Sequence, residues 1–290
     1  MSGQNKIGVI VIHGMGAQQP RFSDALKVEV SNRLGSAAAR FVWREIYWAD
    51  VLEVRESALW ECMRKGKEPD GSPIPLDWRA IREFVVHNFG DALAYHRDLG
   101  PATIYDQIQR RISDGLSALR EALNDPTAPL IVMAHSLGAH MMSDYIWDLQ
   151  KRNWKGAGPD PRESIANLAA MVTFGCNIPL FSLEFKVATP IDLPGPGVTK
   201  AQLKAAARWL NFLDRDDVLG WPLRPLYEKE LGRLDPAQED TVSRIHDHEI
   251  NVGDLVTSWN PMCHSAYWTD NEFTKPVAAY LQTVLRALDA

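Results

Sequence analysis

Short apolar runs with no alternating polar residues constrain the fold of this chain most strongly. Three of them stand out: KIGVIVIHGMG from Lys6, PLIVMA from Pro129 and LAAMVTFG from Leu168. A strand that is apolar on both faces is buried on both sides, which is the pattern of a parallel sheet. Glycines close the first and third runs, as they do where a strand enters a tight connection. These runs therefore predict the centre of an α/β sheet.

Other segments extend this pattern. Less regular strands are expected at 41–48 (FVWREIYW), 207–214 (ARWLNFLD) and 243–250 (SRIHDHEI). Helical spacing of apolar residues is expected at 51–65, 76–98, 103–123 and 275–288. Strands that alternate with helices predict an α/β protein, a mostly parallel sheet with helices on both faces.

No linker or internal repeat divides the chain, so we predict a single domain over residues 1–290. Its 290 residues are enough for one α/β domain. Residues 51–125 form a helical insertion between early strands in this prediction. We expect that insertion, together with the Pro- and Gly-rich loop at 189–197, to lie over a site at the sheet edge and to form a lid or cap.

Composition excludes several classes of protein. A formal net charge of −6 argues against a nucleic-acid partner, which would require a basic surface. Three cysteines, far apart and without a CxxC motif, argue against a disulfide framework and fit a reducing, cytoplasmic location. No apolar segment has the length needed to span a bilayer, so we expect no stable membrane insertion. The oligomeric state is left open by the sequence.

The stretch PLIVMAHSLGAHMM joins a buried strand to a helix through a His-Ser turn. A serine at such a turn is held above the sheet on strained backbone, and the residues two before and two after it must be small. Ala134 and Gly138 meet this requirement around Ser136. The helix that follows points its amide dipoles at the serine, which favours a developing oxyanion. The pattern predicts Ser136 as a nucleophile.

A nucleophilic serine needs a base, and the base needs an orienting acid. In this type of fold the chain order is serine, then an acid after a later strand, then a histidine near the C-terminus. The acidic turn after the strand at 207–214 offers Asp216 and Asp217, and we favour Asp217, with Asp216 as the alternative. His264, in the loop before the last helix, is the expected base.

Two backbone amides are candidates for an oxyanion hole. Leu137 follows the nucleophile, and Met15 lies in the HGMG turn after the first strand, where glycines let the backbone amide face the site. A dinucleotide-binding motif is the rival interpretation of HGMG. It fails because Gln19 occupies the position of the third glycine.

Together, VIVIHGMG, MAHSLG, NFLDRDDVLGWPL and CHSAYW resemble the α/β-hydrolase superfamily, in particular its lipase-like serine esterases. The motifs are short, but they extend from Lys6 to Trp268. The resemblance implies an eight-stranded, mostly parallel sheet, no cofactor and no metal. It also implies the roles assigned to Ser136, Asp217 and His264. The alanine two residues before the serine departs from the usual glycine.

The expected function is hydrolysis of small-molecule carboxylic esters, including lipid-like or other apolar acyl esters. A thioesterase, amidase or acyltransferase would use the same three side chains, and a non-catalytic scaffold that binds a ligand is a third alternative. The paired histidines His246 and His248 have a spacing that metal sites use, although no further ligand lies nearby in the sequence, and we interpret them as polar residues of a sheet face. Residues expected to contact the substrate are His13, Gly14, Asn177, Trp221 and Trp268.

Overall fold

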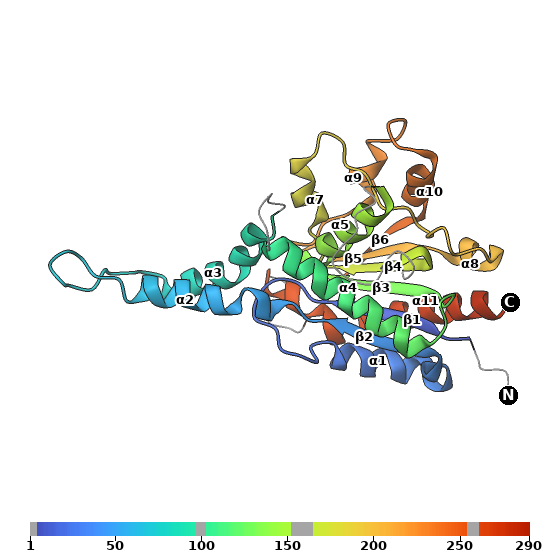
Figure 1. The fold of residues 1–290 in the computed structure, drawn as a ribbon, viewed down its shortest axis with the longest axis horizontal. Helices are drawn as coiled ribbons and strands as arrows, with labels where there is room; N and C mark the ends of the chain where they lie inside the picture. The colour runs from blue at the N-terminus through green and yellow to red at the C-terminus, as the bar shows by residue number, and fades with distance from the viewer. Residues whose placement is uncertain (1–4, 97–102, 152–164, 254–260) are drawn as a thin grey trace.

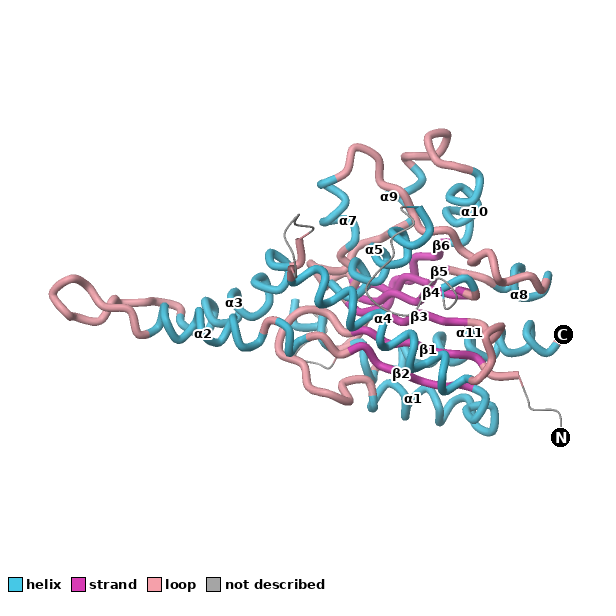
Figure 2. Tube along the Cα trace, in the orientation of Figure 1, coloured by secondary structure: helices cyan, strands magenta, loops and turns pink. Residues whose placement is uncertain are grey.

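The computed structural model describes residues 5–96, 103–151, 165–253 and 261–290. Within these ranges, six strands form one sheet in the order β2-β1-β3-β4-β5-β6, and every neighbouring pair is parallel (Figures 1 and 2). The predicted α/β class with a parallel sheet is confirmed. The strands are β1 (Ile7–Ile12), β2 (Phe41–Ile46), β3 (Leu130–His135), β4 (Leu168–Phe174), β5 (Trp209–Asp214) and β6 (Ile245–Ile250).

Helices cover both faces of the sheet because successive side chains of each strand point to opposite sides. In β1, Val9 and Val11 enter one core, whereas Ile10 and Ile12 enter the other. The first core is closed by α1 (Asp24–Leu34), α8 (Ala201–Ala206) and α11 (Asn271–Asp289). The second is closed by α4 (Ile104–Leu123), α5 (Leu137–Lys151), α9 (Arg224–Glu228) and α10 (Pro236–Arg244).

The sheet differs from expectation in its number of strands and in some strand bounds. The strands expected at 207–214 and 243–250 begin two residues later, at Trp209 and Ile245. The resemblance implies eight strands, but the described residues form six, because the segments between them are helices and loops that add no strand to the sheet. The second strand ends at Ile46 and not at Trp48. There the backbone N–H of Trp48 donates to His13 Nε2 at 3.1 Å, and its indole N–H donates to the His13 carbonyl at 3.0 Å. These bonds turn the chain out of the sheet.

Residues 51–125 have two different structural roles. Helix α4 begins at a capping box formed by Thr103 and Asp106, and it packs directly on β1 and β2. By contrast, α2 (Glu53–Arg64) and α3 (Arg79–Ala94) pack on each other and project beyond the sheet as a helical arm (Figure 1). Among the described residues, no helix is both long and apolar enough to cross a membrane.

The two ends of the loop at 189–197 lie in different places. Thr189 lines the cavity along α5 (Leu137–Lys151), whereas the Gly195–Gly197 end lies away from the serine. Gly195 N–H donates to the Leu168 carbonyl at 2.8 Å, and Gly197 N–H donates to the Ala166 carbonyl at 2.7 Å. Both acceptors lie at the amino-terminal end of β4, whereas Ser136 follows the carboxyl end of the neighbouring β3. The middle of the loop is part of the packed structure, with Leu193 1% exposed.

Candidate active site

Ser136 occupies the turn between β3 and α5, with a positive φ of 51°. Residues other than glycine rarely adopt this backbone conformation, and such strain is concentrated at functional sites. The surroundings are tight on both sides. A Cβ on Gly14 would lie 2.5 Å from the Ser136 Cβ, and a Cβ on Gly138 would lie 2.4 Å from the His13 carbonyl oxygen. Only glycine at these two positions allows the turn and the preceding loop to approach each other.

The structure brings the three predicted side chains together. His264 Nε2 lies 2.7 Å from Ser136 Oγ, and His264 Nδ1 lies 2.8 Å from Asp217 Oδ1. Asp216 is exposed, and its backbone N–H donates to the neighbouring Asp214 side chain at 2.8 Å. Of the two candidate acids, Asp217 therefore is the one in contact with the histidine.

Asp217 lies in a polar setting that favours its charged form. Burial opposes ionisation most strongly, but the hydrogen bond and charge of His264 and the hydrogen bond from Tyr267 outweigh it, so the pKa of Asp217 is lowered. Tyr267 O–H donates to Asp217 Oδ2 at 2.8 Å, and Leu219 N–H donates to Oδ1 at 3.0 Å. The carboxylate is thus ionised and fixed beside the imidazole.

Two residues that sequence reasoning missed support this arrangement. His135, 5% exposed, donates from Nε2 to the backbone carbonyl of His264 at 2.8 Å. Burial, together with the charge of the nearby His264, lowers the pKa of His135 to about 3, so its ring is neutral. Tyr267, which is fully buried, holds Asp217. Both lie in the quoted motifs, MAHSLG and CHSAYW, but their contacts span too many residues for a sequence pattern to show.

The expected oxyanion donors lie on either side of the serine turn. Leu137 is the first residue of α5, and Met15 directly follows Gly14, which abuts Ser136. His13 shapes this loop. Its Nδ1 donates to the Gly14 carbonyl at 2.7 Å, its Nε2 accepts from Trp48, and its ring stacks on the Trp48 indole. Burial lowers the pKa of His13 to about 4. With both nitrogens engaged and no exposed surface, His13 is placed to hold the loop and not to touch a substrate.

The other predicted contact residues have varied positions. Trp268 packs on His135, Phe174 and Phe22. The side chain of Asn177 is 1% exposed, and its Oδ1 has no hydrogen-bond partner among the described residues. Trp221 is 42% exposed, and its backbone N–H donates to the Cys176 carbonyl at 2.8 Å. In the rival metal pair, the His248 ring stacks on Phe212.

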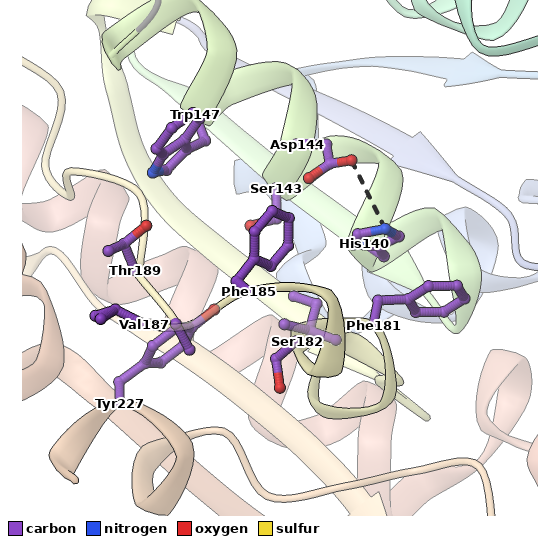
Figure 3. Close-up of a pocket in the computed structure, with 12 residues that line it drawn as sticks. His140, Ser143, Asp144, Trp147, Phe181, Ser182, Phe185, Val187, Thr189 and Tyr227 are labelled. Atoms are coloured by element: carbon purple, nitrogen blue, oxygen red, sulfur yellow. Dashed lines mark ion pairs between the residues drawn. The ribbon is translucent and has the colours of Figure 1, made fainter. Parts of the chain in front are cut away.

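An apolar cavity of about 220 Å³ lies along α5 (Figure 3). Its first lining residue on that helix, His140, follows Ser136 by four positions, which is about one helical turn. His140 forms its near end; the ring stacks on Phe181 at 4.2 Å, and its Nε2 lies 3.6 Å from Asp144 Oδ2. Tyr227 points its hydroxyl toward the middle of the cavity (Figure 3). The lining residues come from α5, from α7 (Ile178–Phe181), from the segment that follows α7 and from α9: His140, Ser143, Asp144, Trp147, Ile178, Phe181, Ser182, Phe185, Val187, Ala188, Thr189 and Tyr227.

Comparison with known proteins gave matches only among solved structures. No protein-family model and no curated protein sequence matches the chain. A cutinase-like protein from Cryptococcus sp. superposes with a TM-score of 0.43 at 11% identity, covering 97% of this chain and 95% of the other. A Thermus thermophilus protein superposes with a TM-score of 0.41 at 14% identity, covering 98% of this chain and 90% of the other. Esterase PE8 superposes with a TM-score of 0.38 at 15% identity, covering 98% of this chain and 94% of the other. Structural similarities with such low TM-scores and sequence identities give no information about the activity of this protein.

The architecture itself is that of the α/β-hydrolase fold. Its parallel sheet is covered on both faces, a serine stands on the strained strand-to-helix turn, and the acid and histidine follow in the order typical of that fold.

Proposed function

We propose that this protein is a serine hydrolase that cleaves carboxylic esters through an acyl-enzyme on Ser136. The observation that carries the proposal is the continuous hydrogen-bonded series from Ser136 Oγ through His264 to Asp217, at 2.7 Å and 2.8 Å. Serine hydroxyls are weak nucleophiles, and a base within hydrogen-bond distance is what makes them reactive.

In this mechanism His264 accepts the Ser136 proton as Oγ attacks the ester carbonyl. The resulting tetrahedral oxyanion is held by the backbone N–H groups of Leu137 and Met15. His264 then gives its proton to the leaving alkoxide, and the acyl-enzyme remains. Water attacks this ester in the second half of the cycle, again with His264 as the base, and the carboxylic acid leaves. Asp217 keeps the Nδ1 proton of His264 in place and stabilises the imidazolium.

The cavity along α5 supports an apolar acyl group in the substrate. His140, Asp144 and Trp147 follow Ser136 at steps of four, four and three, so the cavity wall continues the helix face that starts at the serine. From His140 to Trp147 the helix rises about 10 Å. A volume of about 220 Å³ is below the roughly 300 Å³ at which pockets for drug-sized ligands begin. One acyl chain, rather than a bulky lipid, fits such a space.

A panel of p-nitrophenyl esters tests the proposal. The wild type is expected to hydrolyse butyrate and octanoate esters, and Ser136→Ala is expected to lose at least about a thousandfold in kcat/KM. Ser143→Phe, which fills the cavity, should reduce turnover of octanoate while sparing acetate. A matching thioester and anilide define the leaving group that the site accepts. Equal turnover by wild type and Ser136→Ala would refute the proposal.

A further inference from the structure

A buried carboxyl joins the helical arm to the loop that carries Met15. Asp91, near the end of α3, is 2% exposed, and its Oδ2 accepts a hydrogen bond from Gly16 N–H at 2.7 Å. The two residues are 75 positions apart in the chain. Gly16 has a φ of 90°, a conformation that glycine tolerates and that turns its amide toward the arm.

This contact completes the support of Met15. The peptide before Met15 is fixed because the Gly14 carbonyl accepts from His13 Nδ1 at 2.7 Å. The peptide after Met15 is fixed because its N–H, that of Gly16, donates to Asp91. Both peptide planes that flank Met15 are therefore held, and the direction of the Met15 N–H follows from them. His13 holds the peptide that contains the Met15 N–H, and Asp91 holds the next peptide. Without Asp91, Met15 is fixed on one side only, so its amide is less precisely oriented.

A second acidic side chain, Glu56 of α2, lines the same cavity as Asp91 and is 9% exposed. Glu56 Oε2 lies 3.2 Å from His87 Nδ1 of α3, whereas the buried Oε1 has no hydrogen-bond donor among the ionised side chains of the described residues and is free to accept a proton from Asp91. Burial, followed by the charge of Glu56, raises the pKa of Asp91 to about 8 despite the Gly16 hydrogen bond. Burial also raises the pKa of Glu56, and Glu53 on the same helix adds to this effect. The charge of His87 opposes the shift of Asp91, and Glu83 lines the cavity beside the pair.

Two carboxyls in contact in a buried site do not both ionise readily, so they share a proton at neutral pH. With that proton in place, Asp91 accepts from Gly16 and donates to Glu56. Above about pH 8 the proton leaves, and two negative charges on α3 and α2 repel each other. Movement of α3 then transmits to Gly16.

We propose that Asp91 is a positioning residue for the oxyanion hole: through Gly16 it aims the Met15 amide at Ser136, and the proton that it shares with Glu56 keeps this contact in place. The inference rests on the proposed esterase function. It predicts that kcat decreases at alkaline pH. Without the carboxyl pair, kcat would stay constant there, because the catalytic histidine is already neutral.

Variants at the pair test this directly. Asn at position 91 accepts from Gly16 and donates to Glu56 as protonated Asp does, so Asp91→Asn should keep the neutral-pH rate and lose the alkaline decline. Glu56→Gln removes the second charge and should also abolish the decline. Asp91→Ala removes the anchor and should lower kcat at pH 7 by about tenfold to a hundredfold, with little change in KM, because a displaced donor acts on the transition state.

Two results would overturn the inference: a wild-type kcat with no alkaline decline, or an unchanged decline in both Asp91→Asn and Glu56→Gln. If Asp91 had a purely structural role, Asp91→Ala would be less stable, but Asp91→Asn and Glu56→Gln would have the same pH profile of kcat as the wild type. Amide hydrogen exchange of residues 13–17 measures the anchor without any turnover. It should be faster in Asp91→Ala than in Asp91→Asn, and equal exchange contradicts the anchor. Failure of the proposed function would appear separately, as activity that survives Ser136→Ala.

Discussion

Tyr267→Phe removes one hydroxyl that serves two partners. In the native protein this hydroxyl donates to Asp217 Oδ2 at 2.8 Å and accepts from Asp214 N–H at 3.0 Å, and the side chain is fully buried. A hydrogen bond to a charged group contributes about 1.5–3 kcal/mol, and leaving a buried donor unpaired costs about 1–3 kcal/mol. The substitution should therefore lower the free energy of unfolding by about 3–5 kcal/mol.

Such a loss is a large part of the stability of a typical domain, about 5–15 kcal/mol, so the variant should fold with a reduced melting temperature. For a protein of this size, with an unfolding entropy of about 0.6 kcal/mol/K, the expected decrease in Tm is roughly 5–8 °C. Thermal unfolding followed by circular dichroism at pH 7 measures it. Tyr227→Phe is the matched control, since that buried hydroxyl faces the apolar cavity. A Tm for Tyr267→Phe within 2 °C of both the wild type and the control would refute the reasoning.

Three further predictions follow from the site. Asp217→Asn should reduce kcat by about 10⁴-fold, whereas Asp216→Asn, at an exposed position, should leave it near the wild-type value; equal losses in steady-state kinetics would remove the distinction between the two acids. Gly14→Ala places a methyl group 2.5 Å from the Ser136 Cβ, so it should lower ester hydrolysis at least about a hundredfold while the far-ultraviolet spectrum is kept, and unchanged kinetics would argue against the tight approach. The pKa of Asp217 is lower in the folded protein than its unfolded value of about 3.9, so its contribution to stability is complete above that pH and is lost as the pH falls through the folded value. Urea unfolding of wild type and Asp217→Asn should therefore show a stability difference at pH 6 that shrinks toward pH 3, and a difference that grows instead would contradict the lowered pKa.

The sheet could be predicted because its strands are buried on both faces. In an α/β protein, a short apolar run such as the one from Lys6 is typical of a strand that helices cover on both faces. The structure has β1, β3 and β4 where these runs predict strands. Strand ends were less predictable. Tyr47 and Trp48 continue the pattern of β2, but the hydrogen bonds of Trp48 to His13 end the strand at Ile46. A contact between residues 35 positions apart cannot be predicted from the sequence around either residue.

The same distinction holds at the site. The order of Ser136, Asp217 and His264 could be predicted because each follows a recognisable strand or precedes the last helix, and the structure brings the three within hydrogen-bond distance. Their catalytic roles stay a prediction. The buried partners Tyr267 and Asp91 could not be found, since their contacts join segments 50 and 75 positions apart.

Labelling with a fluorophosphonate, followed by peptide mass spectrometry, tests the central claim most directly. Such a probe reacts with a serine only when a neighbouring base activates it, so it reports the pairing with His264 without any assumption about the natural substrate. A single adduct is expected on the peptide that contains Ser136 in the wild type, with none in Ser136→Ala and a strongly reduced rate in His264→Gln. A folded wild type that forms no adduct, or an adduct that persists in Ser136→Ala, would contradict the account.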